Sequence, residues 1–302
     1  MIKRTLCFSN PTYLSMQNRQ LVARIDPHDD QPARHATVPI EDIGIIVLDN
    51  RQITVTHALL AALLDNNASV VTCDERHMPV GLMLPLEGNT IQSERFHDQL
   101  SASVPLRKQL WQQTVQQKIL NQAALLRHLH HIETGNMQCW AAEVRSGDST
   151  NLEGRAAAYY WSQLLPDLNN FTRQRDGIYP NNLFNYAYAI LRAVVARALV
   201  SSGLLPTLGI HHHNRYNAYC LADDIMEPYR PFVDRLVMQT LPQLQPIDDL
   251  TPDIKRTLLT VPTLEVRIGG QRSPLMVAAS QTTASLARCF SGESRRITYP
   301  EM

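Results

Sequence analysis

The feature that most constrains this chain is a change of hydrophobic period near residue 90. Before it, short β-branched runs such as "IGIIVLD" (Ile43–Asp49) and "ASVVTCD" (Ala68–Asp74) lie between turn-forming residues, which predicts strands. After it, leucine, isoleucine and Trp111 recur every three or four residues through Val104–Ile132, which predicts a long amphipathic helix. This succession indicates an α+β fold, in which a small N-terminal β-rich domain is followed by a larger all-α domain.

The remaining predicted elements fit this division. The first part also contains a hairpin within Leu14–Asp26, a short helix within Val55–Asn67 and a third strand within Gly81–Leu86. Because Gly88 and Asn89 interrupt the pattern, we place the N-terminal domain at 1–88, a linker at 89–95 and the helical domain at 96–302. Further helices are predicted within 152–165, 181–203, 232–244, 251–261 and 274–289.

The charge of the chain gives only weak evidence about partners. Its 302 residues include 28 basic and 28 acidic side chains, so the net positive charge of many nucleic-acid-binding proteins is absent. Residues 1–90 carry 7 basic and 10 acidic side chains, whereas residues 91–302 carry 21 and 18. DNA contacts would therefore depend on local patches or on a partner. No apolar run is long enough to predict a membrane span, and the start lacks a signal-peptide core, so we expect a cytoplasmic protein without membrane association.

The first candidate site residue is Glu153 in "STNLEGRAAAYYW". Glu153 follows Thr150 by three residues at the start of a predicted helix, which is the spacing of a capping box. A carboxylate there also lies near the positive end of the helix dipole, which keeps it ionised for a metal. Gly154 leaves space beside it for a ligand or another backbone segment. The spacing leaves both roles open.

The second candidate is the triplet His211, His212 and His213. Side chains of consecutive residues diverge in a helix or a strand, so at most one or two of them serve one ion. The alternative is that each histidine is solvated or hydrogen-bonded in a polar loop.

The third candidate is the acidic segment "ADDIMEPYRP". Asp224 and Glu227 are three residues apart and share a helix face, while Asp223 is suited to cap the helix. Pro228 and Pro231 predict an irregular helix just after Glu227. One histidine nitrogen with carboxylate oxygens suits Mg²⁺ or Mn²⁺, which commonly act on phosphates. A metal-dependent phosphoryl-transfer site is thus one hypothesis beside a solvated acidic helix start.

Four motifs in this order resemble those of a known family, the CRISPR-associated integrase called "protein one" of the bacterial adaptation machinery. They are Glu153-Gly154 before an alanine-rich helix, Asn181–Leu191, the Gly-x-x-His of 209–212, and 224–231 followed by Asp234. The resemblance covers nearly the whole chain. The segment Val38–Leu86 further resembles the compact form found in type II systems.

The resemblance implies that Glu153, His212 and Glu227 are catalytic residues that bind Mg²⁺ or Mn²⁺, with Asp224 as an additional ligand or a supporting group. It implies an integrase that uses the 3′-hydroxyls of a captured duplex to attack phosphodiesters at the array repeat, inserting a new spacer for antiviral defence. Endonuclease activity is expected of the same site.

The implied partners are double-stranded DNA, both prespacer and repeat array, and a second copy of the chain, bound through the N-terminal domains. A small "protein two" would bridge two such dimers, and the resemblance leaves room for further type II adaptation proteins and the effector nuclease. We assign no DNA-binding residue. The arginines near the motifs are candidates for phosphate contacts: Arg155, Arg173, Arg175, Arg192, Arg197, Arg215, Arg230 and Arg235.

Two other classes of function remain as alternatives. A non-catalytic DNA-binding scaffold would use the metal positions structurally, although such a protein would be expected to have lost one of the three residues. A metal-dependent repair nuclease that does not integrate would keep all of them.

Overall fold

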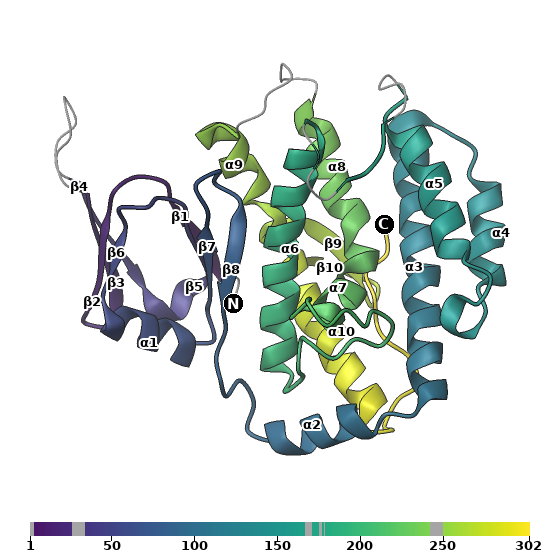
Figure 1. The fold of residues 1–302 in the computed structure, drawn as a ribbon, viewed down its shortest axis with the longest axis horizontal. Coiled ribbons are helices and arrows are strands. Elements are labelled where there is room, and N and C mark those ends of the chain that lie inside the picture. Colours follow the sequence, from purple (N-terminus) through teal and green to yellow (C-terminus); the bar gives the residue numbers. More distant parts are fainter. Residues whose placement is uncertain (1–2, 26–33, 167–170, 175–176, 178, 242–249) are drawn as a thin grey trace.

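A computed structural model of the chain describes residues 3–25, 34–166, 171–174, 177, 179–241 and 250–302 (Figure 1). Within these residues, the N-terminal part contains two four-stranded sheets and one α-helix, α1 (His57–Asp65). Asn18 and Arg19 both have positive φ and close the predicted hairpin as a tight two-residue turn. The strands of the first sheet are, in spatial order, β4 (Arg34–Pro39), β3 (Gln20–Ile25), β2 (Tyr13–Gln17) and β6 (Thr54–Val55). Those of the second sheet are β1 (Arg4–Phe8), β5 (Ile43–Leu48), β7 (Ser69–Cys73) and β8 (Pro79–Met83).

The central strand β5 is buried on both faces. Ile46 packs into a core that the two sheets share with α1. Ile45 and Val47 instead belong to the large core of the helical part. Because both faces of β5 are covered, its side chains are apolar on both sides, and this explains the continuous apolar sequence "IGIIV". The second sheet is therefore a middle layer between the first sheet and the helices.

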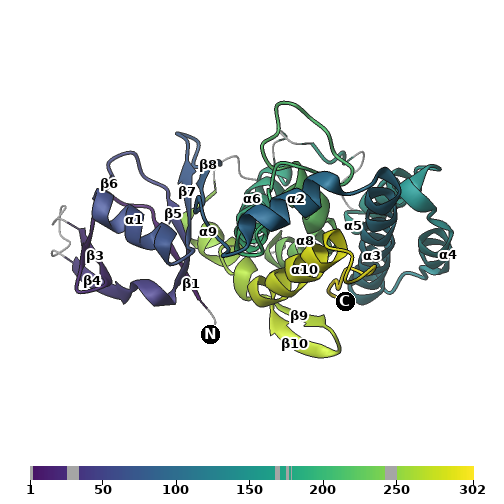
Figure 2. The ribbon, with the colours of Figure 1, turned by 90° about the horizontal axis from the view of Figure 1, so that it is seen from below.

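Helices make up most of the C-terminal part, as predicted. Figures 1 and 2 show α6 beside the N-terminal sheets and α3, α4 and α5 at the far end. A buried ion pair adds to the junction with the sheets, since Lys255 Nζ lies 2.8 Å from Asp49 Oδ2. The helices are α2 (Gln92–Ser101), α3 (Val104–His130), α4 (Gly135–Glu143), α5 (Leu152–Leu164), α6 (Asn181–Ser201), α7 (Cys220–Met226), α8 (Arg230–Thr240), α9 (Pro252–Leu258) and α10 (Leu275–Phe290).

Helix α6 forms the centre of this part. By length and composition it is apolar enough to cross a membrane, but 78% of its apolar window is buried inside the protein. It contacts α7, α8 and α10, which is the environment of a core helix.

The α+β class is confirmed, but the C-terminal part is not purely helical. Strands β9 (Glu265–Ile268) and β10 (Gln271–Pro274) form a hairpin, in which Gly269 and Gly270 supply the two positive φ values of the turn. Helix α4 lies outside the predicted elements, and α2 begins inside the predicted linker, at Gln92. The domain boundaries themselves stay predictions.

Candidate active site

Glu153 lies in the first turn of α5, but it does not form the predicted capping box. The cap is Asn151, whose side chain accepts a hydrogen bond from Gly154 N at 3.2 Å. The Asp148 carboxylate accepts from the N–H groups of Leu152 and Glu153, both at 2.9 Å. Because these groups satisfy the helix start, the capping-box prediction for Thr150 was wrong and the Glu153 carboxylate is available for other contacts.

Gly154 makes room for this cap, not for a ligand. A Cβ at Gly154 would lie 2.7 Å from Asn151 Oδ1, closer than carbon and oxygen atoms approach. The predicted free space beside Glu153 is therefore filled by the cap side chain.

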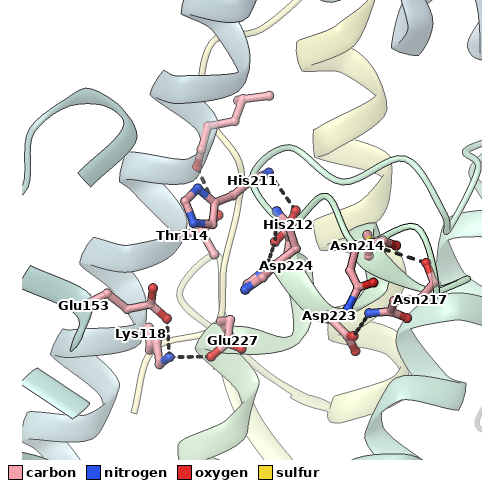
Figure 3. Close-up of polar contacts among 12 residues, drawn as sticks. Thr114, Lys118, Glu153, His211, His212, Asn214, Asn217, Asp223, Asp224 and Glu227 are labelled. Atoms are coloured by element: carbon pink, nitrogen blue, oxygen red, sulfur yellow. Dashed lines mark hydrogen bonds and ion pairs between the residues drawn. The ribbon is translucent and has the colours of Figure 1, made fainter. Parts of the chain in front are cut away.

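A buried lysine from α3 joins two of the predicted site residues. Lys118 Nζ lies 2.6 Å from Glu153 Oε1 and 2.6 Å from Glu227 Oε2 (Figure 3). Arg230 Nη2 contacts the other oxygen of Glu227 at 2.9 Å. Burial raises the pKa of Glu227, but Arg230 and Lys118 outweigh burial and hold that pKa below its ordinary value. Burial alone would lower the pKa of Lys118, but the charges of Glu227 and Glu153 outweigh burial and raise that pKa above its ordinary value.

Glu227 is placed by an irregular helix, as the two prolines predicted. Helix α7 gives way at Glu227 to a single 3₁₀ turn, Glu227–Tyr229, before α8 begins. Asp224 and Glu227 are both buried. Asp223 was predicted to cap the helix, which was wrong: it lies within α7, and its oxygens bind Arg192 Nε at 2.6 Å and Asn217 Nδ2 at 2.7 Å.

Asp224 holds the loop that carries the histidines. Its carboxylate accepts hydrogen bonds from the backbone N–H of His211 at 2.9 Å and of His212 at 3.3 Å. It also accepts from His212 Nδ1 at 2.5 Å, and this hydrogen bond raises the pKa of His212 against the effect of burial. Gly209 is required for this geometry, because a Cβ there would lie 2.4 Å from His212 O and 2.8 Å from Asp224 Oδ2.

The three histidines have different surroundings. His211 stacks on Trp111, with ring centroids 4.1 Å apart and planes 2° from parallel, and burial and the neighbouring His212 lower its pKa. His213 lines two adjoining pockets of about 590 and 340 Å³ that also share Arg107. Of the three, His212 alone has a ring that a carboxylate of the described residues holds, that of Asp224. In Figure 3, Lys118 lies between Glu153 and Glu227, and His212 and Asp224 lie on the side of Glu227 away from Lys118.

The donor set fits a hard divalent cation. Within the described residues, Glu227 Oε2 is buried and accepts no hydrogen bond, so its short contact is the ion pair with Lys118. Two carboxylates thus already hold a positive charge between them. Asp224 occupies His212 Nδ1, which leaves Nε2 as the nitrogen for a metal. Carboxylate and imidazole donors suit Mg²⁺ or Mn²⁺. Nevertheless, no three His, Cys, Asp or Glu side chains of the described part converge closely enough to hold a metal as they stand.

Several candidate arginines have partners within the protein. Arg230 binds Glu227, and Arg175 lies outside the described residues. The others contact Asn181 and Asn185 (Arg173), Asp223 (Arg192), the carbonyl of Asn67 (Arg197) or the rings of Trp140 (Arg155), Tyr216 (Arg215) and Phe232 (Arg235).

Lys118 and the basic pair Arg107 and Lys108 were not predicted from the sequence. Lys118 continues the buried stripe of α3 that includes Trp111 and Val115, and a lysine in an apolar stripe signals a buried anionic partner. Arg107 and Lys108 line the smaller pocket together with Trp111, which follows Arg107 by four residues and Lys108 by three.

Comparison with known proteins gives consistent matches. The sequence model of the family described as "CRISPR associated protein Cas1" matches residues 6–260. The "CRISPR-associated endonuclease Cas1" of Neisseria meningitidis serogroup C (strain 8013) is 38% identical over 100% of this chain and 97% of that protein. A "CRISPR-associated endonuclease Cas1 2" of Pyrobaculum aerophilum is 25% identical over 83% of this chain and 89% of its own.

Two solved structures share the fold. A casposase bound to an integration product superposes with a TM-score of 0.79 at 18% identity, covering 98% of this chain and 92% of its own. A CAS1 protein from Thermotoga maritima gives 0.76 at 15% identity, covering 96% of this chain and 97% of its own.

Proposed function

Because this chain belongs to the Cas1 family of CRISPR-associated proteins, we propose that it is a metal-dependent DNA endonuclease and integrase of CRISPR adaptation. In this function, the 3′-hydroxyls of a captured duplex attack phosphodiesters at the array repeat and insert a new spacer. The observation that carries the proposal is the convergence of Glu153 and Glu227 on one position, with the His212 ring fixed beside them by Asp224.

Glu153, Glu227 and His212 would hold Mg²⁺ or Mn²⁺. When bound, the metal supplies Lewis-acid activation of a hydroxyl and stabilisation of the leaving oxygen. Asp224 orients His212 and fixes its tautomer, because its carboxylate accepts the Nδ1 proton. Arg230 anchors Glu227 through the oxygen that does not face Lys118, so that Oε2 stays directed at the site. Asp224 therefore acts as a positioning residue and not as a ligand.

The proposed partners are DNA and a small adaptation protein. The nearby pockets carry Arg107, Lys108 and Arg215, which suit phosphate contacts on a chain of zero net charge. A solved Cas6-RT-Cas1–Cas2 complex has a TM-score of 0.74 to this chain at 19% identity, over 97% of this chain and 35% of its own, which supports a Cas2-like partner. We further propose a homodimer formed through the N-terminal sheets, a type II system and a cytoplasmic location.

An integration assay tests the proposal. Purified protein, its small partner, Mn²⁺ or Mg²⁺ and a plasmid with a repeat array should join a short labelled duplex at the repeat. Glu153→Gln, His212→Ala and Glu227→Gln should each abolish joining, whereas Glu143→Gln, an exposed carboxylate at the end of α4, should not change it.

The pattern of failure separates the alternatives. Loss of joining in His211→Ala but not in His212→Ala would show that the wrong histidine has been chosen. Cutting without joining would favour a repair nuclease. DNA binding without either reaction would favour a non-catalytic scaffold.

A further inference from the structure

Lys118 occupies a position in which a lysine is rare. Its side chain is only 10% exposed, and its nitrogen lies 2.6 Å from one oxygen of Glu153 and one of Glu227. Burying an ammonium group is costly unless anionic partners surround it, so these two carboxylates are what keep it there. The three groups come from α3, the start of α5 and the turn after α7, which lie far apart in the sequence.

The carboxylate pair needs a cation in order to stay together. Both carboxylates lie within contact distance of the same nitrogen, and Glu227 is almost fully buried, so their mutual repulsion is poorly screened. Arg230 offsets part of the charge of Glu227, but through the oxygen on the other side. Lys118 is the group that both carboxylates share.

A divalent cation and the ammonium group cannot use this position together. Mg²⁺ binds carboxylate oxygens at about 2.0–2.1 Å, so a metal shared by Glu153 Oε1 and Glu227 Oε2 would occupy the space in which Nζ lies. Like charges at that separation repel strongly. The flexible four-carbon side chain of a lysine can move away by rotation, whereas a planar guanidinium held by two carboxylates would move less readily.

We propose that Lys118 is an internal counter-ion, which holds Glu153 and Glu227 together in the metal-free protein and leaves them when a divalent cation binds. The inference rests on the proposed function, since it assumes that the two carboxylates are metal ligands. Its consequence is that the metal affinity of the protein is set by a competition, in which the metal must displace a charge that the chain itself supplies.

The test replaces Lys118 with methionine, whose unbranched side chain is one atom shorter and carries no charge. Metal binding is measured without DNA, by titrating Mn²⁺ and following free Mn²⁺ by electron paramagnetic resonance, and the melting temperature is measured with and without Mn²⁺. Metal-free Lys118→Met should melt below the wild type, Mn²⁺ should raise its melting temperature by more, and it should bind Mn²⁺ at least about fivefold more tightly. The factor of about five corresponds to about 1 kcal/mol, which is the repulsion between two unit charges about 4 Å apart in water.

Lys255→Met is the matched control. Lys255 is another buried lysine in an ion pair, with Asp49, at the junction with the N-terminal sheets. It should lower the melting temperature without changing Mn²⁺ affinity. If Lys118→Met does not fold, Lys118→Gln provides the same test, because it keeps a hydrogen-bond donor between the carboxylates without the charge.

The outcomes separate this inference from the proposed function. Unchanged or weaker Mn²⁺ binding in the folded Lys118 variant, with wild-type binding intact, would overturn the counter-ion inference alone. Wild-type protein that binds no Mn²⁺, or binds it equally well after Glu227→Gln, would overturn the proposed metal site itself.

Discussion

Replacing Asp224 tests how the histidine loop is held. Asp224→Ala removes the acceptor of three hydrogen bonds, two from the backbone N–H groups of His211 and His212 and one from the His212 ring. A buried donor left without an acceptor costs about 1–3 kcal/mol, and the half-exposed loop favours the lower end of this range for each N–H. The ring contact adds about 1 kcal/mol, because solvent screens a side chain that is 46% exposed. The expected loss of unfolding free energy is therefore about 3 kcal/mol.

The stability assay is urea unfolding of the metal-free protein, followed by tryptophan fluorescence. Asp224→Asn, which keeps one acceptor oxygen, should lose about half as much as Asp224→Ala. An alanine variant within about 0.5 kcal/mol of the wild type would show that these hydrogen bonds do not hold the loop.

A double-mutant cycle then decides whether Asp224 acts through His212 or binds the metal itself. Asp224→Asn should weaken Mn²⁺ binding by about 10-fold to 100-fold in the wild-type background. In the His212→Ala background it should add almost nothing, because the group that it positions is already gone. A full additional loss in that background would make Asp224 a ligand and refute the positioning role.

Three further outcomes are expected. Burial raises the pKa of Asp234 to about 6 although two tyrosine hydroxyls donate to it, so its contribution to stability is full below about pH 4 and is lost as the pH rises through 6. Asp234→Asn should therefore gain about 3 kcal/mol relative to the wild type between pH 4 and pH 7, measured by urea unfolding, and equal pH profiles would contradict this. Gly209→Ala should cost about 1–3 kcal/mol of unfolding free energy and weaken Mn²⁺ binding, because its Cβ would displace the His212 carbonyl; an unchanged affinity would argue against this coupling. Lys255→Met should cost about 3–5 kcal/mol, because buried Asp49 loses its lysine partner and keeps only the contact of its other oxygen with His77, and a double variant with Asp49→Asn should recover part of that loss.

Local chemistry explains which parts of the site could be predicted from the sequence. The irregular turn at Glu227 was correctly predicted, because two prolines disrupt a helix wherever it packs. The start of the α5 helix was also located, but its cap was misassigned. Asn151 adopts a left-handed backbone conformation that asparagine tolerates and accepts from the N–H of Gly154, while Asp148 accepts from the N–H groups of Leu152 and Glu153. Several polar residues precede α5, and the sequence alone does not show which of them caps the helix.

The contacts that assemble the site depend on tertiary structure. Nothing near Lys118 in the sequence identifies Glu153 or Glu227 as its partner, since those contacts arise only when α3 packs against the other two elements. The family resemblance identified His212 as the histidine of the site, because three consecutive histidines cannot be distinguished by their hydropathy. The same limit applies to β5, whose apolar run predicted a strand but not that its two faces belong to different cores.

The distribution of the site along the chain has a consequence for protein synthesis. Lys118, Glu153, His212 and Glu227 come from four separate segments, and the last of them follows three quarters of the polypeptide. Chains fold domain by domain as they leave the ribosome, so an incomplete chain has the β-rich part and the first carboxylate but no second one. A translation product that ends before residue 227 therefore lacks Glu227 and cannot assemble the proposed site.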